Sequence, residues 1–243
     1  EMVIRDWSSD VCSSDLVERV YADSGIQRIR LGSLEPYSIS GEFIGRLSKI
    51  PGLCPHFHLS LQSGSDTVLE RMNRKYDTGY FRDIVCTIRQ AFDSVMLTAD
   101  IITGFPGETD EEHEQTLSFC REMDFLDMHI FKYSKRAGTK AAAMPFHVKP
   151  EVINKRSGEL LELAYSMRRS NLERAAGRKF SVLIESVSGG FAEGYTENYM
   201  RVKVVCKEET EALKPRIGNI YPVTAVFAKD DSLIAEFCYN SIS

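Results

Sequence analysis

Hydrophobic and polar residues alternate with two different periods along residues 26–134. Four segments have the alternating or continuous apolar pattern that is typical of strands: residues 26–33, 56–65, 95–103 and 126–134. Residues 40–52, residues 78–92 and a segment that opens at Asp110 repeat their apolar positions at helical spacing. Because strands and helices alternate over short connections, the pattern predicts an α/β fold with a parallel sheet or barrel.

The pattern changes after a long amphipathic segment at residues 150–176, which predicts a helix. Beyond Gly177, five short alternating segments are separated by Gly, Asn and Asp: KFSVLIESV, GFAEGYT, MRVKVVC, NIYPVTAVFA and SLIAEFCY. Short strands with such turns predict a small antiparallel β-barrel. The domain boundary is therefore expected near residue 177.

Residues 1–16, EMVIRDWSSDVCSSDL, have neither pattern. Asp6, Asp10 and Asp15 interrupt every apolar pair, and the segment lacks the basic start and apolar run of a signal peptide. On its pattern alone, this segment is expected to be a disordered N-terminal arm.

The composition is that of a globular protein, with 43% hydrophobic and 27% charged residues among 243 and a net charge of −5. The charge does not mark a nucleic-acid binder, although a local basic face is compatible with it. Six widely spaced cysteines form no CxxC or CxxxCxxC motif, so the spacing predicts neither a zinc nor an iron–sulfur site. Free thiols in a reducing, cytoplasmic setting are expected.

Unusual polar residues follow the predicted strands, where α/β folds bind their ligands. In LQSGS, Ser60 and Gln62 share a strand face, and Gly64 would let a ligand approach the backbone. The same residues also fit a plain strand–helix turn with Ser65 as N-cap. Spacing does not decide between these two interpretations.

Asp100 places a charge inside the apolar strand of DIITGFPGET, and its burial requires a partner. Gly104 and Gly107 flank Pro106 in a narrow turn against which a planar ligand could lie. A purely structural turn is the alternative, but Asp100 favours a functional one.

Basic and imidazole side chains lie near the second strand. Arg71, Arg74 and Lys75 could clamp a carboxylate or phosphate, or form an ordinary solvated helix end. His56 and His58 are expected on one strand face, but no third ligand is identifiable, so no metal site is predicted.

The small barrel carries aromatic and basic residues in GYTENYMRVKV. Tyr195, Tyr199, Arg201 and Lys203 could stack on bases and contact phosphates of RNA. Aromatic residues are also common in strands for packing reasons alone.

Taken together, RIRLGSLEP, LCPHFHLSLQSGSDTVLERMNRKY, TADIITGFPGET, HIFKYSKRAGTKAA and GYTENYMRV resemble, in this order, the radical S-adenosylmethionine (SAM) methylthiotransferases. LGSLEP and LCPHFHLSLQSG are most similar to the MtaB type, which modifies N6-threonylcarbamoyladenosine at tRNA position 37. The alternatives are the MiaB type, which acts on isopentenyladenosine, and the RimO type, which acts on a ribosomal protein. The resemblance covers about residues 17–240.

The resemblance implies residues 17–176 as the C-terminal part of a radical SAM partial (β/α)6 barrel and residues 177–243 as a TRAM-like barrel that holds tRNA. It implies SAM as a cofactor and, in the full-length parent, two 4Fe-4S clusters whose cysteine motifs are absent from this sequence. The parent enzyme would add a methylthio group to C2 of adenosine 37 in the tRNA anticodon loop, and this chain alone is expected to be inactive. A non-catalytic tRNA-binding module is the alternative from another functional class.

The resemblance also implies roles for individual residues. The expected SAM and substrate contacts at the barrel mouth are Glu35, Gln62, Ser63, Arg74, Asp100, Gly104, Pro106, Phe131 and Tyr133. The expected tRNA contacts are Lys135, Arg136, Tyr195, Tyr199, Arg201 and Lys203. No catalytic residue is assigned.

Residues 1–16 stand where the family has its cluster-binding domain and first strands. DWSSDVCSSDL is similar to one reading frame of a common sequencing-adapter oligonucleotide. We therefore expect residues 1–16 to be either an assembly artefact or a disordered arm, with the family sequence resuming at Val17.

Overall fold

The structure, a computed structural model, describes residues 10–206 and 214–238 of the chain. It divides into two compact units, Glu1–Tyr165 and Ser166–Ser243. The division falls within helix α6 (Pro150–Arg174), before the predicted boundary near residue 177. The last turns of this helix are grouped with the second unit.

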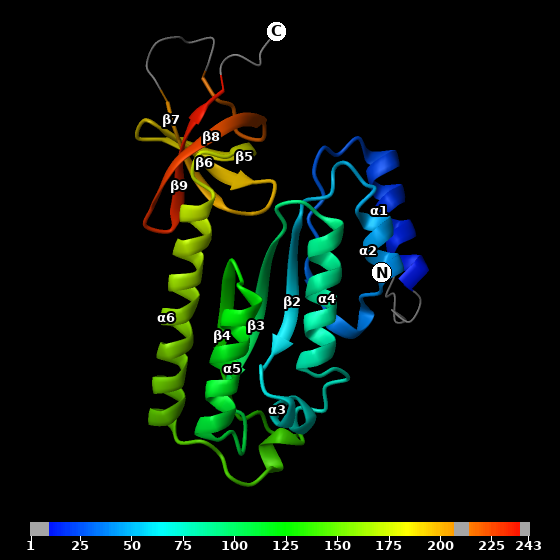
Figure 1. The fold of residues 1–243 in the computed structure, drawn as a ribbon, viewed down its shortest axis with the longest axis vertical. Helices are drawn as coiled ribbons and strands as arrows, with labels where there is room; N and C mark the ends of the chain where they lie inside the picture. Colours follow the sequence, from blue (N-terminus) through cyan, green and yellow to red (C-terminus); the bar gives the residue numbers. More distant parts are fainter. Residues whose placement is uncertain (1–9, 207–213, 239–243) are drawn as a thin grey trace. The chain divides into compact units, whose positions relative to one another are not determined.

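The first unit is built on a four-stranded sheet in the order β1-β2-β3-β4, in which every neighbouring pair is parallel. The strands are β1 (Ser33–Leu34), β2 (His56–Gln62), β3 (Met96–Thr103) and β4 (Asp127–Lys132) (Figure 1). The helices are α1 (Asp10–Ser24), α2 (Gly41–Leu47), α3 (Asp66–Arg71), α4 (Thr78–Ala91) and α5 (Asp110–Met123). Short 3-10 helices cover Pro36–Ser38 and Ala141–Ala143. The predicted alternation of strands and helices is confirmed.

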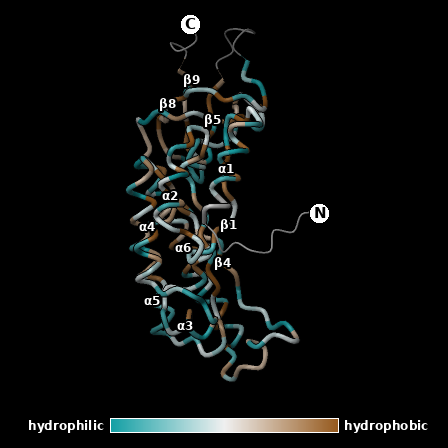
Figure 2. The backbone as a smooth tube through the Cα atoms, turned by 90° about the vertical axis from the view of Figure 1, so that its right-hand side faces the viewer, coloured by the Kyte–Doolittle hydropathy of each residue, from teal (hydrophilic) through white to brown (hydrophobic). Residues whose placement is uncertain are grey.

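The two faces of this sheet differ in chemistry. Phe57, Leu59 and Leu61 of β2 are fully buried on one face, and the apolar faces of α2, α4 and α5 supply the other half of this core. On the opposite face β2 presents His56, His58, Ser60 and Gln62, which are also buried. The alternation of hydrophobic and hydrophilic residues is visible along the backbone in Figure 2. The sheet therefore has an apolar face that packs against helices and a buried polar face on its opposite side.

Helix starts are fixed by side-chain caps. Ser40 Oγ accepts a hydrogen bond from Phe43 N at 3.1 Å, and Asp77 Oδ1 accepts one from Tyr80 N at 2.7 Å. Thr109 and Glu112 form a reciprocal capping box at the start of α5. These capping bonds fix the residues at which α2, α4 and α5 begin.

The second unit is a closed barrel in the order β5-β6-β7-β9-β8. Its strands are β5 (Lys179–Ser188), β6 (Phe191–Thr196), β7 (Arg201–Val205), β8 (Ile220–Lys229) and β9 (Ser232–Phe237). Alternate residues such as Val182, Val202 and Ala235 fill its interior. The five predicted strands are confirmed, but the expected all-antiparallel pairing is wrong, since β7 and β9 pair in parallel to close the barrel.

The segment at residues 26–33 differs from the predicted strand. Before Ser33, only Ile29 of this segment pairs, in an isolated parallel bridge with Leu53, and the ladder with β2 begins at Ser33. Ile26 remains 45% exposed, so the apolar start of this segment buries too little surface to form a strand at the sheet edge.

Residues 10–16, expected in a disordered arm, lie in α1, and residues 1–9 are outside the described range. Arg46 of α2 forms ion pairs with Asp15 and with Glu18, the latter at 2.6 Å. Gly52 leaves room for the Tyr21 ring, since a Cβ at residue 52 would lie 2.2 Å from that ring. These contacts attach α1 to the first unit, while the foreign origin of residues 1–16 stays a prediction.

Among the described residues, no helix combines the length and apolar character needed to cross a bilayer.

Candidate cofactor and RNA sites

The carboxyl ends of the four parallel strands bring predicted cofactor residues to one edge of the sheet. Glu35 follows β1, Gln62 ends β2, Gly104 follows β3 and Tyr133 follows β4. Because neighbouring strands run in the same direction, these four positions fall in a row along the edge. Their role in binding stays a prediction.

Glu35 and Arg74 form an ion pair at this edge. Arg74 Nη1 lies 3.2 Å from Glu35 Oε1 and 3.3 Å from Oε2, and both side chains are partly exposed. The pair joins the end of β1 to the loop after α3. It leaves guanidinium and carboxylate atoms accessible to a polar ligand.

Gln62 has a left-handed backbone, with φ of 67°, where the β2–β3 pairing changes register. The hydroxyl of Tyr76 donates to the carbonyl oxygens of Ser60 and Leu61 just before this residue. Burial raises the pKa of Tyr76, so this donor keeps its proton at neutral pH. The Tyr76 hydroxyl therefore supplies a hydrogen-bond donor to two carbonyl groups beside the irregularity in the β2–β3 pairing. The left-handed backbone of Gln62 ends the strand.

The turn after Gln62 is packed against α5 rather than open to a ligand. A Cβ at Gly64 would lie 2.8 Å from Thr116 Cα, so the expected ligand approach over Gly64 is taken by this helix. Ser63 is 2% exposed, and its hydroxyl lies 3.2 Å from Thr116 Oγ1 and accepts from Ser65 N. Ser65 stands at the N-cap without a capping bond and instead donates to Gln115 Oε1 at 2.7 Å. A ligand contact by the Ser63 side chain would require these bonds to break.

The GFPGE turn after β3 closes around the carboxylate of Glu108. Glu108 Oε2 accepts from Gly104 N at 2.5 Å and Phe105 N at 3.1 Å. Burial raises the pKa of Glu108, against the lowering effects of the Gly104 amide and of Arg156, whose Nη1 lies 3.3 Å from Oε1. The turn containing buried Pro106 is thereby fixed to α6.

Gly104 is required at its position for two reasons. Its φ is +80°, and a Cβ there would lie 2.4 Å from the side chain of Ile153. The glycine thus allows Ile153 of α6 to pack closely against the turn that follows β3.

Asp100 does not lie at the edge with the other predicted residues. It sits three residues before the end of β3, between His58 Nε2 at 3.0 Å and His129 Nδ1 at 3.2 Å. The expectation that Asp100 needs a partner is met by two histidines. His56, two residues before His58 on β2, has a pKa lowered to about 3, chiefly by burial, and is neutral.

Phe131 lies near the end of β4, and Tyr133 follows the strand directly. The Phe131 side chain is on the same strand face as His129, and the residue is 52% exposed. The Tyr133 ring meets Phe105 edge-on and stacks on His147. Its Oη is buried and has no hydrogen-bond partner in the described part of the chain. A buried hydroxyl without a partner is suited to form a hydrogen bond with a polar ligand at the sheet edge.

The outer face of the barrel carries four of the six residues predicted to bind RNA: Tyr195, Tyr199, Arg201 and Lys203. The rings of Tyr195 and Tyr199 stack with centroids 4.6 Å apart, and Tyr195 pairs in register with Arg201. Arg201 lies 3.0 Å from Asp231 and 3.3 Å from Glu193, and Lys203 lies 3.3 Å from Glu193. A phosphate must therefore compete with carboxylates for both cations.

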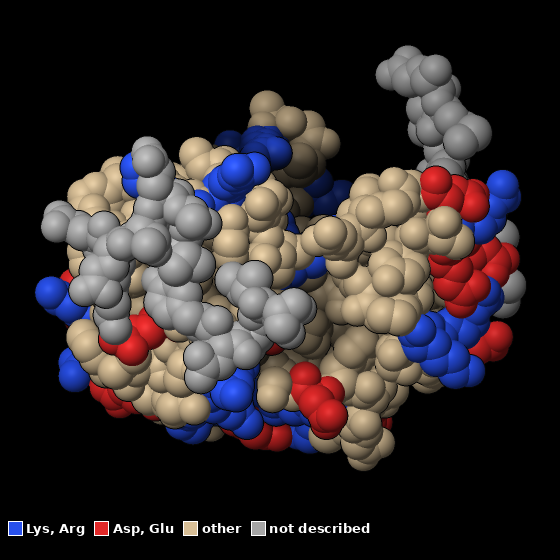
Figure 3. Space-filling view, turned by 90° about the horizontal axis from the view of Figure 1, so that it is seen from above, with Lys and Arg blue, Asp and Glu red and all other residues tan. Residues whose placement is uncertain are grey.

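Lys135 and Arg136 are exposed on the loop after β4 in the first unit. On the face shown in Figure 3, basic and acidic side chains lie beside one another.

The described cysteines do not fit a 4Fe-4S cluster. Cys86 lies on α4 and Cys120 on α5, while Cys54, Cys206 and Cys238 lie in three separate connecting segments, and none of the five is in a disulfide. Burial raises the pKa of Cys120 to about 12, so this thiol is protonated and is a poor metal ligand. The side chains that could hold SAM are present at the sheet edge, but a set of cluster thiolates is not found among the described residues.

Two residues of this region, Arg156 and His129, were not predicted from the sequence. Arg156 is buried on α6 and reaches Glu108 and Asp110 across more than forty residues of sequence. His129 joins Asp100 because β3 and β4 pair in register at these positions. A strict alternation count on β4 would have placed His129 on the polar face, whereas Arg156 gave no local signal.

Comparison with known proteins agrees with this architecture. A family model described as the radical SAM superfamily matches residues 15–120. Threonylcarbamoyladenosine tRNA methylthiotransferase MtaB of Bacillus subtilis is 36% identical over 204 residues, which cover 82% of this chain and 45% of that protein. The tRNA-2-methylthio-N(6)-dimethylallyladenosine synthase of Caldicellulosiruptor saccharolyticus is 37% identical over 196 residues, covering 80% and 42%.

Among solved structures, coproporphyrinogen III oxidase of Escherichia coli, a radical SAM enzyme, matches with a TM-score of 0.52 and 16% identity, covering 70% of this chain and 39% of that one. This likeness concerns the fold alone. The chain spans about half the length of the curated relatives it matches. Its parallel sheet, the matched family model and its relatives agree: the chain belongs to the radical SAM superfamily and is a relative of its tRNA methylthiotransferases.

Proposed function

We propose that this chain is the SAM-binding and tRNA-binding part of a tRNA methylthiotransferase that acts on N6-threonylcarbamoyladenosine 37. The observation that carries the proposal is the row of Glu35, Gln62, Gly104 and Tyr133 along one edge of the parallel sheet. The sheet edge would bind SAM, and the barrel, as a TRAM-like domain, would hold the tRNA.

The edge offers complementary groups for SAM. Arg74 can pair with the carboxylate of the methionine moiety, and Glu35 with its ammonium group or a ribose hydroxyl. The buried Tyr133 Oη gains a hydrogen-bond partner when a polar ligand group reaches it. Exposed Phe131 offers a face for the adenine ring of SAM or of the tRNA substrate.

The RNA part of the proposal rests on the stacked tyrosines. Tyr195 and Tyr199 give an aromatic platform on the barrel surface, next to Arg201 and Lys203. A base can stack on such a platform while the cations contact phosphates. Lys135 and Arg136 would add phosphate contacts from the first unit.

The assignment to threonylcarbamoyladenosine rests on the sequence phrases LGSLEP and LCPHFHLSLQSG. Relatives named for threonylcarbamoyladenosine and for dimethylallyladenosine have nearly equal identity, 36% and 37%. The substrate therefore has to be tested directly.

In the full-length parent, a 4Fe-4S cluster would supply radical chemistry to SAM held at this sheet edge. The described cysteines are too dispersed to ligate such a cluster, so the role of this chain is to bind and orient SAM and tRNA. The same dispersion favours a second candidate function, a tRNA-binding module without catalysis.

Two titrations on the full chain test the proposal and distinguish the candidates. SAM is titrated by calorimetry, and tRNA by gel mobility shift at low salt, for the unaltered chain, Arg74→Gln and Tyr199→Ala. We expect R74Q to weaken only SAM binding and Y199A only tRNA binding, so each variant controls for the other. Binding of tRNA without SAM supports the non-catalytic module, and binding of neither contradicts both candidates.

A further inference from the structure

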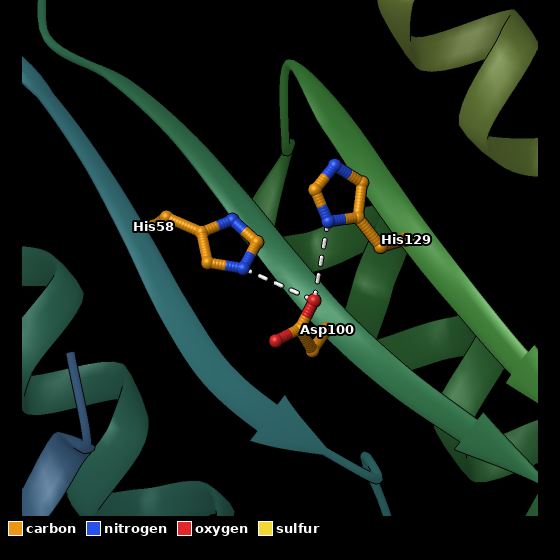
Figure 4. Close-up of side chains that lie close together, drawn as sticks. All are labelled: His58, Asp100 and His129. Atoms are coloured by element: carbon orange, nitrogen blue, oxygen red, sulfur yellow. Dashed lines mark ion pairs between the residues drawn. The ribbon is translucent and has the colours of Figure 1, made fainter. Parts of the chain in front are cut away.

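Three potential metal-ligating side chains meet on the polar face of the sheet. They are His58 of β2, Asp100 of β3 and His129 of β4, and their nearest ligand atoms all lie within 4.8 Å of one another (Figure 4). Both histidines approach the same carboxylate oxygen, Asp100 Oδ1, at 3.0 Å from His58 Nε2 and 3.2 Å from His129 Nδ1. The group draws one residue from each of three adjacent strands.

Strand register produces this convergence. Asp100 pairs with His129, and His58 pairs with Thr98, two residues before Asp100 on the same face of β3. Parallel strands hold such neighbours at fixed positions, so the three side chains are pre-arranged by the backbone ladder. His58 is 9% exposed at its side chain, Asp100 20% and His129 57%, which gives the group one side open to solvent.

We propose that His58, Asp100 and His129 bind one divalent transition-metal ion of the zinc type. Ligand atoms at about 2.0–2.1 Å from a tetrahedral zinc ion lie about 3.3 Å from each other. The two distances to Asp100 Oδ1 are close to this value. Two imidazoles and one carboxylate form a donor set that suits Zn²⁺ or Co²⁺, and three protein ligands leave a coordination position for water.

The second ring nitrogen of His58 supports this assignment. His58 Nδ1 lies 2.8 Å from Thr98 Oγ1, and Thr98 is buried. When Nδ1 carries the proton and donates a hydrogen bond to Thr98 Oγ1, the lone pair of Nε2 is directed to the metal. A hydrogen bond from the non-ligating nitrogen is the usual way in which proteins orient a metal-binding histidine.

The three ligands lie on the strands before the sheet-edge residues Glu35, Gln62, Gly104 and Tyr133, and the metal proposal does not rest on the proposed function. Sequence analysis predicted no metal site because His56 and His58 lacked a third ligand. The fold supplies different partners for His58, from β3 and β4, and leaves His56 outside the group.

Titration of Co²⁺ into the metal-free full chain tests the proposal. We expect visible ligand-field bands that saturate at one equivalent and disappear when Zn²⁺ is added. His129→Ala and Asp100→Asn should lower the affinity at least about tenfold. His147→Ala removes an exposed histidine outside the group and should leave the affinity unchanged.

Circular dichroism checks that the variants fold, and His129→Gln repeats the test with a side chain nearer in size. Loss of the bands in H129Q and D100N but not in H147A supports the site. The proposal is wrong if Co²⁺ does not bind, if H129Q and D100N bind it as the unaltered chain does, or if thiolate charge-transfer absorption identifies cysteine ligands.

Discussion

The carboxylate of Glu35 and the guanidinium of Arg74 meet at 3.2 Å, joining the end of β1 to the loop that follows α3. The pair is partly exposed, so its own contribution to stability is expected to be only about 0.2–1 kcal/mol. Because the pair lies along the row of strand ends, we expect it to matter more for ligand binding than for folding.

Replacing Arg74 with Gln should therefore weaken SAM binding by roughly 10–100-fold, the value of a charge-assisted hydrogen bond. The free energy of unfolding should fall by less than about 1 kcal/mol. Calorimetry with SAM and urea unfolding measure the two effects, and Lys75→Gln is the matched control on the neighbouring exposed cation. A large loss of stability with unchanged SAM affinity would mean that the pair is structural.

Gly64 is predicted to be intolerant of a side chain. In Gly64→Ala the new Cβ would lie 2.7 Å from Phe119 Cβ and 2.8 Å from Thr116 Cα, and a backbone atom of α5 cannot easily move. We expect a loss of about 1–3 kcal/mol in the free energy of unfolding. Gly45→Ala is the control, since nothing lies within 4 Å of its Cβ in α2 and alanine should stabilise the helix by about 0.5–1 kcal/mol. Equal effects of the two substitutions would refute the packing argument.

Glu112 should make stability depend on pH in the acid range. The two-pronged bond from Arg71, at 2.8 and 2.6 Å, is the main reason that the pKa of Glu112 falls to about 2. Since the folded pKa is below the usual value of 4.5, the stabilisation is complete above about pH 4.5 and is lost as pH falls toward 2.

Glu112→Gln should accordingly cost roughly 2 kcal/mol at pH 7, after allowance for the partial exposure of Arg71, and less than half of that at about pH 3. Urea unfolding followed by circular dichroism at the two pH values measures this difference. Glu114→Gln on the exposed side of α5 should have little effect at either pH. A pH-independent cost for E112Q would rule out the ionic contribution.

Arg201 is expected to contact a phosphate of RNA after exchanging its partners Asp231 and Glu193. Arg201→Gln should reduce the slope of log affinity against log salt concentration by about 1. Mobility shifts over a salt series give this slope, with Arg121→Gln on α5 as the control. An unchanged slope would place the RNA elsewhere.

Periodicity predicted most of the fold because each element obeys a local rule. The helix over Thr78–Ala91 and the strand over Met96–Thr103 follow from the spacing of their own residues. The parallel pairing of β7 with β9 did not follow, because barrel closure depends on strands distant in sequence. The short β1 was missed since its length depends on what lies beside it.

The candidate site was predictable to the extent that it lies at strand ends. Glu35, Gln62 and Tyr133 belong to that class. Ser63 illustrates the limit, since its sequence is equally suited to a ligand turn and to the α5 contact that the fold contains. Which of these two structures forms depends on whether a helix packs against Ser63, and the local sequence does not determine this.

The central claim is most directly tested by binding of anticodon stem–loop RNAs that differ only at position 37. The full chain is titrated with RNAs carrying threonylcarbamoyladenosine, isopentenyladenosine or unmodified adenosine, in the presence of SAM. We predict that the threonylcarbamoyl form binds most tightly and that Tyr199→Ala weakens its binding by about 1–3 kcal/mol, the value of one stacked base. Tighter binding of the isopentenyl form, or equal binding of all three RNAs, would contradict the account.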